Sequence, residues 1–208
     1  AILERYGMTE TNMNTSNPYD GERRAGTVGF PLPGVEVIVT NQENGQILPS
    51  GEIGVLEVRG PNVFKGYWEM PEKTSEELRE NGFFITGDLG TISEDGYVSI
   101  VGRSKDLIIS GGYNIYPKEI EVFLDGLDGV LESAVIGIPH PDFGEGVVAV
   151  IVPQSRAKLI QEDVMLKLKD QFARFKHPKR IVFIDELPRN TMGKVQKKDL
   201  RERFARLF

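Results

Sequence analysis

The residues best suited to chemistry lie near the start of the sequence, in the run YGMTET at residues 6–11. This run brings an aromatic ring, hydroxyl groups and a carboxylate together within a few positions. An aromatic ring can stack on a nucleobase, a hydroxyl can hydrogen-bond a phosphate oxygen, and a carboxylate can hold Mg²⁺. A turn beside a strand has the same composition, so the run alone fits either a nucleotide site or an ordinary turn.

A second cluster, Thr86-Gly87-Asp88, follows the apolar run at residues 83–85, which we expect to be a short strand. A carboxylate at the end of a strand is well placed to accept hydrogen bonds from ribose hydroxyls. An aspartate that caps a helix or begins a turn is the alternative for Asp88.

Two further clusters join charge to glycine. Residues 102–117 (GRSKDLIISGGYNIYP) contain Gly111 and Gly112, where the backbone could approach a narrow ligand closely. Residues 188–195 (PRNTMGKV) form a predicted turn that presents Lys194. A flexible cation in that place could neutralise negative charge that develops on a carboxyl or phosphate group.

Several classes of protein are disfavoured by residues that the sequence lacks. It has no GxxxxGK[ST] or GxGxxG motif, and the Gly193-Lys194 pair has no glycine at the upstream position that a phosphate loop requires. The absence of cysteine excludes disulfides, thiol catalysis and cysteine-based zinc sites. With His140 and His177 as the two histidines, a histidine-rich metal centre is disfavoured, and we expect both to be structural.

The composition is that of a globular protein with a real core: 208 residues, 39% hydrophobic and 27% charged. There is no apolar run of the roughly 18 residues that a membrane span needs, and no signal peptide opens the chain, so we expect a cytoplasmic protein that does not enter a membrane. The net charge is −6, but residues 1–102 carry −9 and the last 38 residues +7. The acidic half argues against nucleic-acid binding. The basic tail fits either a polyanionic small molecule or a solvated helix face.

The elements that position these clusters fall into two groups. In the first, period-two alternation and glycine-containing turns predict short strands at 35–39, 53–58, 83–85 and 97–101, with a helix at 71–81. In the second, apolar patterns predict helices at 117–127, 162–175 and 197–207 and strands at 133–138, 146–152 and 181–184. We therefore expect an α/β and α+β protein, with a small antiparallel β subdomain in residues 1–104 and an α+β domain in residues 105–208.

The motifs, taken in order, resemble those of the acyl-adenylate-forming (AMP-binding) superfamily, which includes acyl-CoA synthetases and peptide-synthetase adenylation domains. They are YGMTE, GEIGVLEVRG with GYW, TGD, GRSKDLIISGGYNIYPKEIE and PRNTMGK, and together they cover essentially the whole chain. The IYPKEIE ending and the GRSKDLI run favour the acyl-CoA synthetases. Residues 4–37 further resemble malonyl-CoA synthetases.

This resemblance implies a ligase that uses ATP, Mg²⁺ and CoA in two half-reactions. A carboxylate, here malonate, and ATP give an acyl-adenylate and pyrophosphate, and CoA then displaces AMP. The resemblance places Tyr6, with Gly7 beside it, against adenine, Thr9 on the phosphate and Glu10 on the metal. Asp88 and Arg103 match ribose-binding positions.

The remaining implied roles fall in the second half of the chain. Lys105 matches the hinge about which a mobile C-terminal domain rotates between the half-reactions. Lys194 matches the lysine that bridges the carboxylate and the α-phosphate during adenylation. The loop Ser110-Gly111-Gly112 matches one that lines the pantetheine tunnel of CoA. A lysine acetyltransferase and deacetylase acting on Lys194 would switch its charge, since acetylation removes the cation.

Arg5, directly before the first motif, would project near the acyl pocket. A guanidinium there could bind the far carboxylate of a dicarboxylic acid with two hydrogen bonds. The alternative is a surface arginine paired with Glu4 or Glu10.

One part of the family pattern is absent: no phosphate loop resembling TSGTTGxPKG occurs in the sequence. We therefore expect the chain to be a C-terminal portion of a longer enzyme. Three alternatives stay open: a synthetase for another acid, an adenylation domain that loads a carrier protein, and a binding module without chemistry.

Overall fold

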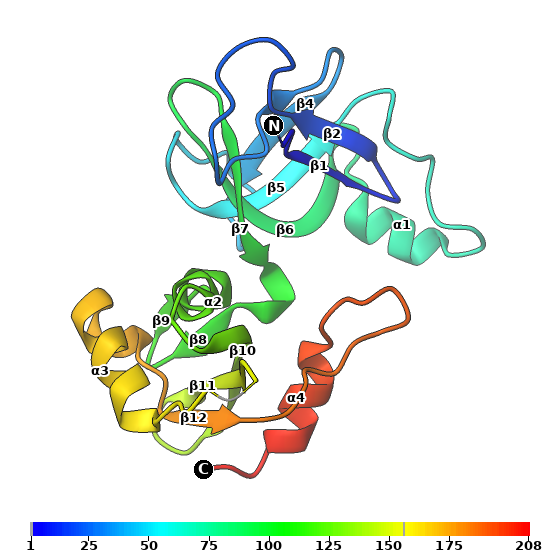
Figure 1. Ribbon diagram of the computed structural model, residues 1–208. Helices are drawn as coiled ribbons and strands as arrows, with labels where there is room; N and C mark the ends of the chain where they lie inside the picture. Colours follow the sequence, from blue (N-terminus) through cyan, green and yellow to red (C-terminus); the bar gives the residue numbers. More distant parts are fainter. Residues whose placement is uncertain (1, 156) are drawn as a thin grey trace. The chain divides into compact units, whose positions relative to one another are not determined.

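The computed structural model describes residues 2–155 and 157–208. The chain divides into two compact units, Ala1–Ser104 and Lys105–Phe208, each of which is described by itself (Figure 1). This division coincides with the change in sequence pattern near Gly102. Within the described ranges, no helix is both long and apolar enough to cross a membrane.

The first unit consists of two antiparallel sheets and one short helix. A three-stranded sheet has the order β1-β2-β3 and a four-stranded sheet has the order β4-β5-β6-β7. The elements are β1 (Arg5–Met8), β2 (Asn12–Ser16), β3 (Phe30–Pro31), β4 (Glu36–Thr40), β5 (Gly54–Arg59), α1 (Pro71–Glu77), β6 (Phe84–Ile92) and β7 (Val98–Arg103). The core gathers Tyr6, Val39, Leu56 and Val98.

One strand of the first unit is longer than the sequence predicts. Strand β6 does not end at residue 85 but continues to Ile92, so the Thr86–Asp88 cluster lies inside the strand. Ile85 pairs with Glu57 of β5, and Leu89 already pairs with Val55, which leaves extra residues of β6 between the two pairs. The prediction that Asp88 sits at a strand end is therefore wrong. A bulge inside a strand, with Gly87 at a φ of 70°, turns the chain there instead.

The second unit is a mixed sheet covered by helices on both faces. Strands run in the order β10-β11-β8-β9, and β12 pairs with β11 in parallel. The elements are β8 (Ile108–Ser110), β9 (Tyr113–Ile115), α2 (Pro117–Asp125), β10 (Val130–His140), β11 (Gly144–Pro153), α3 (Gln161–Gln171), β12 (Arg180–Phe183) and α4 (Lys197–Phe204).

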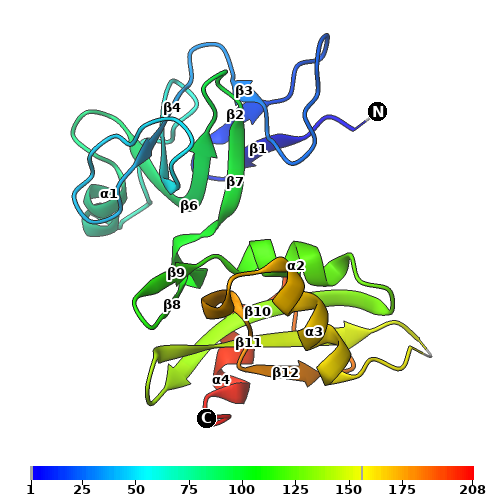
Figure 2. The same ribbon diagram turned by 90° about the vertical axis from the view of Figure 1, so that its left-hand side faces the viewer.

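Strand β11 shows why this sheet is covered on both sides. Successive side chains of a strand point to opposite faces, and here both sets are apolar and buried. Val147, Ala149 and Ile151 pack with α2 and α3, whereas Val148 and Val150 pack with Leu200 of α4. Figure 2 shows α2 and α3 together on one face of the sheet, with α4 on the other. The predicted fold class of mixed α/β with antiparallel sheets is confirmed.

All four predicted helices end earlier than the sequence predicts, α2 at Asp125 and α4 at Phe204 by two or three residues. In the other two, the residues that follow the helix adopt a different backbone structure. Helix α1 ends at Glu77, since Leu78 has an extended backbone and forms a β-bridge with Phe84. Helix α3 ends at Gln171, and a separate 3₁₀ turn, Arg174–Lys176, follows.

Candidate functional site

Three candidate nucleotide-binding residues meet at one point in the first unit. The hydroxyl of Tyr6 in β1 donates to Oδ2 of Asp88 at 2.6 Å, and Nε of Arg103 lies 2.7 Å from Oδ1 of the same carboxylate. Asp88 and Arg103 face each other directly across β6 and β7. Asp88 lies at the bulge of β6, where its backbone N–H donates to the hydroxyl of Thr86 at 3.0 Å.

The environment of Tyr6 differs from that of a surface phenol. Burial raises the pKa of Tyr6, and the negative charge of Asp88 raises this pKa further. The phenol therefore stays protonated as a donor. The side chain of Arg103 remains about half exposed, so this cluster presents a cation beside a buried carboxylate.

The turn between β1 and β2 carries Thr9 and Glu10, and a glycine makes it possible. A Cβ at Gly7 would meet the backbone oxygen of Asn12 at 2.1 Å, so no side chain fits there. Thr9 is exposed and Glu10 is partly buried. The backbone oxygen of Glu10 accepts the N–H of Phe64 at 2.8 Å, which ties the turn to the segment after β5.

Tyr67, for which the sequence pattern predicts no role, contacts Glu10. Its hydroxyl lies 3.2 Å from Oε1 of Glu10 and 2.5 Å from Oε2 of Glu77. Burial raises the pKa of Tyr67, with a further contribution from its hydrogen bond to Glu77. The signal was present in the GYW motif, but the pairing across 57 residues was not visible in the sequence.

Arg5 lies on β1 with an exposed side chain. Because neighbouring residues of a strand point to opposite faces, Arg5 points away from the face on which Tyr6 is buried. Within residues 2–155 and 157–208, the ion pairs do not include one between Arg5 and either Glu4 or Glu10. The alternative of a surface ion pair is thus not observed.

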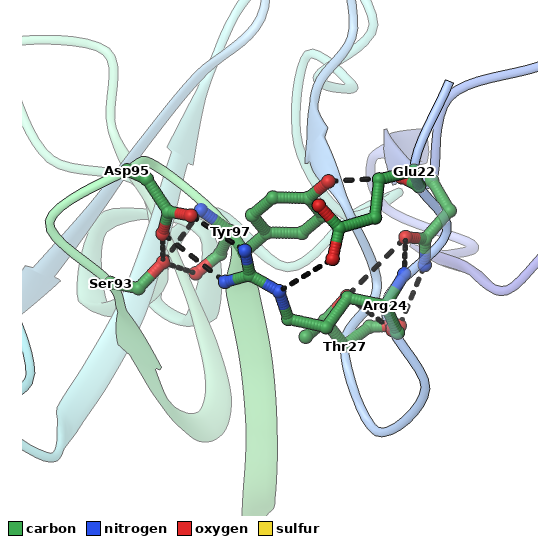
Figure 3. Close-up of polar contacts among 7 residues, drawn as sticks. Glu22, Arg24, Thr27, Ser93, Asp95 and Tyr97 are labelled. Atoms are coloured by element: carbon green, nitrogen blue, oxygen red, sulfur yellow. Dashed lines mark hydrogen bonds and ion pairs between the residues drawn. The ribbon is translucent and has the colours of Figure 1, made fainter. Parts of the chain in front are cut away.

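The long loop between β2 and β3 is held by contacts of Arg24 that lie outside the predicted site (Figure 3). Arg24 pairs with both carboxylate oxygens of Asp95, at 3.2 and 2.7 Å, and its guanidinium lies 3.9 Å from the centroid of the Tyr97 ring. Figure 3 shows Arg24 lying against Tyr97, with Ser93 next to Asp95. The hydrogen bonds of Arg24 and Ser93 lower the pKa of Asp95 to about 2.

In the second unit, the candidate hinge residue Lys105 is followed directly by Asp106, which forms an ion pair with helix α4. Lys105 is exposed within a 3₁₀ turn, Ser104–Asp106. Arg201 of α4 pairs with Asp106 at 2.7 Å and donates to the backbone oxygen of Lys105 at 3.4 Å. The segment after Lys105 is therefore fastened to the second unit, whether or not Lys105 acts as a hinge.

Gly111 and Gly112 connect β8 to β9, and Ser110 is the last residue of β8. Gly111 and Gly112 have φ values of 59° and 82°, as a tight two-residue hairpin requires. The turn adjoins Phe143, whose backbone oxygen accepts the N–H of Gly111 at 2.9 Å. Next to it lies a recess of about 420 Å³ lined by Tyr113, Phe143, Arg174, Phe175 and Lys179. The recess combines aromatic rings with two cations.

Lys194 is exposed on the loop between β12 and α4. The structure thus brings Tyr6, Asp88 and Arg103 together within the first unit, near the turn that carries Thr9 and Glu10. Lys105, the Ser110–Gly112 turn and Lys194 lie on the second unit. Within the described residues, no group of three or more acidic or histidine side chains forms a ready-made metal cage.

Two models of a known protein family match this chain. The AMP-binding enzyme model matches residues 1–68, and the model of the AMP-binding enzyme C-terminal domain matches residues 119–194. The chain belongs to the family of AMP-binding enzymes. The first match contains the turn with Thr9 and Glu10, and the second ends on Lys194.

Individual proteins are similar to this chain over almost its whole length. The chain is 44% identical to the malonate–CoA ligase of Arabidopsis thaliana, covering 97% of this chain and 34% of that protein. It is 41% identical to the feruloyl-CoA synthase of an Amycolatopsis species, covering 99% of this chain and 42% of that protein. ATP-bound MatB from Rhodopseudomonas palustris matches with 62% identity and a TM-score of 0.96, over all of this chain and 41% of that one. The chain therefore spans well under half of each of these relatives.

Proposed function

We propose that this chain is part of an acyl-CoA ligase that activates malonate with ATP and transfers the acyl group to CoA. The observation that carries the proposal is the meeting of Tyr6, Asp88 and Arg103, three separated motif residues, at one buried carboxylate. In this assignment, Tyr6 packs against adenine while Asp88 and Arg103 bind the ribose. The likeness to ATP-bound MatB supports the assignment.

The carboxylate of Glu10 is a suitable ligand for Mg²⁺. Mg²⁺ is commonly held by one or two carboxylates together with substrate phosphates, and Glu10 is a partly exposed carboxylate on a turn. When bound, the metal would neutralise phosphate charge. We assign Glu10 to hold it and Thr9 to hydrogen-bond the phosphate, with Gly7 keeping the turn tight enough to present both.

Lys194 supplies the cation for the first half-reaction. A lysine ammonium is a compact point charge on a flexible stem, suited to bridging a carboxylate and an α-phosphate. In the second half-reaction, Lys105 acts as the hinge and the Ser110–Gly112 turn lines the path of pantetheine. Acetylation of Lys194 would remove its charge, which remains a prediction, as does a cytoplasmic location.

The recess beside the Ser110–Gly112 turn supports CoA as the acceptor. The rings of Tyr113 and Phe175 are stacked with centroids 4.6 Å apart, and Arg174 and Lys179 line the recess with positive charge. Aromatic rings suit a nucleobase and cations suit phosphate groups, both of which CoA carries. A carrier protein has no adenine to place there.

Malonate is proposed because Arg5 is exposed beside the nucleotide-binding motif and because a malonate–CoA ligase is among the relatives. The far carboxylate of malonate would bind the guanidinium of Arg5. In the full-length ligase, Arg5→Leu should raise the KM for malonate far more than the KM for ATP. Arg23→Leu, in the loop between β2 and β3, is the control. Equal changes in both constants, or unchanged constants, would refute malonate recognition by Arg5.

A further inference from the structure

The loop that carries Lys194 is organised around one side chain, Asn190, to which no role has been assigned. Oδ1 of Asn190 accepts the backbone N–H groups of Met192 at 3.0 Å and of Lys194 at 2.9 Å. The backbone N–H of Asn190 donates to the backbone oxygen of Lys194 at 3.0 Å, and the backbone oxygen of Asn190 accepts the N–H of Gly193 at 2.9 Å. Asn190 thus holds Lys194 by both its N–H and its C=O.

Glycine at position 193 allows this closed loop to form. Gly193 has a φ of 78°, a conformation that side chains with a Cβ rarely adopt, although nothing lies within 4 Å of the place where a Cβ would stand. The requirement is therefore one of backbone conformation and not of space.

Both ends of the loop are fastened to the body of the second unit. At the first end, Arg189 donates to the backbone oxygen of Gly193 at 2.7 Å and pairs with Glu132 of β10. At the second end, Nζ of Lys197 lies 2.6 Å from Oε1 of Glu121, a buried carboxylate of α2. An exposed loop with this many fixed points has its backbone set before any ligand arrives.

From this geometry we infer that Asn190 is a positioning residue that fixes the backbone of Lys194 for the adenylation half-reaction. The inference rests on the proposed function. A lysine side chain has many rotamers, and a mobile backbone beneath it would multiply the arrangements that must be lost to reach one productive position. Small displacements of a positioned group can lower a rate by about a hundredfold.

The side-chain oxygen of Asn190 is the group that holds the loop backbone. Substitutions can therefore separate the effect of this oxygen from the effect of side-chain size. Asn190→Leu keeps a similar size but removes the acceptor. Asn190→Asp keeps an acceptor oxygen for both N–H groups. A matched control lies in the first unit, where Oδ1 of Asn41 accepts the N–H groups of Glu43 at 2.8 Å and Asn44 at 3.3 Å. Asn41→Leu removes the same kind of turn far along the chain from Lys194.

The test measures the two half-reactions separately in the full-length ligase. Asn190→Leu should slow carboxylate-dependent ATP–pyrophosphate exchange by at least about tenfold, while CoA transfer from supplied acyl-adenylate stays within about twofold. Asn190→Asp should restore most of the exchange rate, and Asn41→Leu should leave it unchanged. Amide hydrogen exchange at Met192 and Lys194 should accelerate in the leucine variant and not in the aspartate variant.

Two results would overturn the inference. One is full exchange activity in Asn190→Leu; the other is an equal loss in both half-reactions that Asn190→Asp does not rescue, which would indicate a general structural role. Lys194→Ala separates this failure from failure of the proposed function. If Lys194→Ala abolishes exchange while Asn190→Leu does not, the positioning role alone is wrong. If Lys194→Ala leaves exchange intact, the assigned role of Lys194 is wrong.

Discussion

The hydroxyl oxygen of Tyr6 lies 2.6 Å from Oδ2 of Asp88, a residue 82 positions further along the chain. The contact joins β1 of the three-stranded sheet to β6 of the four-stranded sheet, so the two sheets of the first unit share one polar centre. Because both side chains are buried, neither can exchange this partner for water at little cost.

Replacement of Tyr6 tests that contact. Tyr6→Phe leaves the ring in place but removes the donor from a buried carboxylate. We expect the free energy of unfolding of the chain to fall by about 1.5–3 kcal/mol, the range for hydrogen bonds to charged groups. Urea denaturation followed by circular dichroism measures it. Tyr19→Phe is the control, since the Tyr19 side chain is largely exposed, and a loss of the same size there would contradict the explanation.

The raised pKa of Tyr6 also predicts how stability depends on alkaline pH. The unfolded phenol ionises near pH 10, whereas the folded phenol ionises at higher pH because of burial and Asp88. The stabilisation is fully present below about pH 10 and is lost as the pH rises above it, because the unfolded state releases its proton first. Unfolding measured between about pH 9 and 11.5 should show a smaller decline in Tyr6→Phe than in the unchanged chain. Identical declines would show that Tyr6 ionises normally.

Gly7 provides a test of the turn that carries Thr9 and Glu10. Gly7→Ala would place a methyl group 2.1 Å from the backbone oxygen of Asn12, and a backbone atom cannot move away cheaply. We expect a loss of more than about 3 kcal/mol in unfolding free energy, since such large effects come from strain of this kind. Gly102→Ala is the matched control, because nothing lies within 4 Å of its Cβ position and its φ lies outside the left-handed region. Similar stability in both variants would contradict the predicted clash.

The sequence was sufficient to predict the elements with regular apolar patterns. Strand β11 and helix α2 are examples, because their patterns reflect burial that the whole element shares. The change in pattern near Gly102 predicts a domain boundary there, and the first compact unit ends at Ser104. These patterns are sufficient to predict the fold class without any knowledge of tertiary contacts.

The contacts that organise the site were not predictable in the same way. The bulge that turns Asp88 toward Tyr6 depends on the pairing of β6 with β5 and β7, which no local pattern encodes. Tyr67 reaches Glu10 only after the chain has folded back between them. Asn190 is part of the PRNTMGK motif, but the motif does not predict its hydrogen bonds, because they form only in the closed loop that Gly193 permits.

The most direct test of the central claim compares the two half-reactions in the full-length ligase with and without Lys194→Ala. We predict that malonate-dependent ATP–pyrophosphate exchange occurs in the unchanged enzyme and falls by about a hundredfold or more in the variant, as the loss of a charge-stabilising group implies. Transfer of the malonyl group from supplied malonyl-adenylate to CoA should survive in both. Absence of malonate-dependent exchange in the unchanged enzyme would contradict the account.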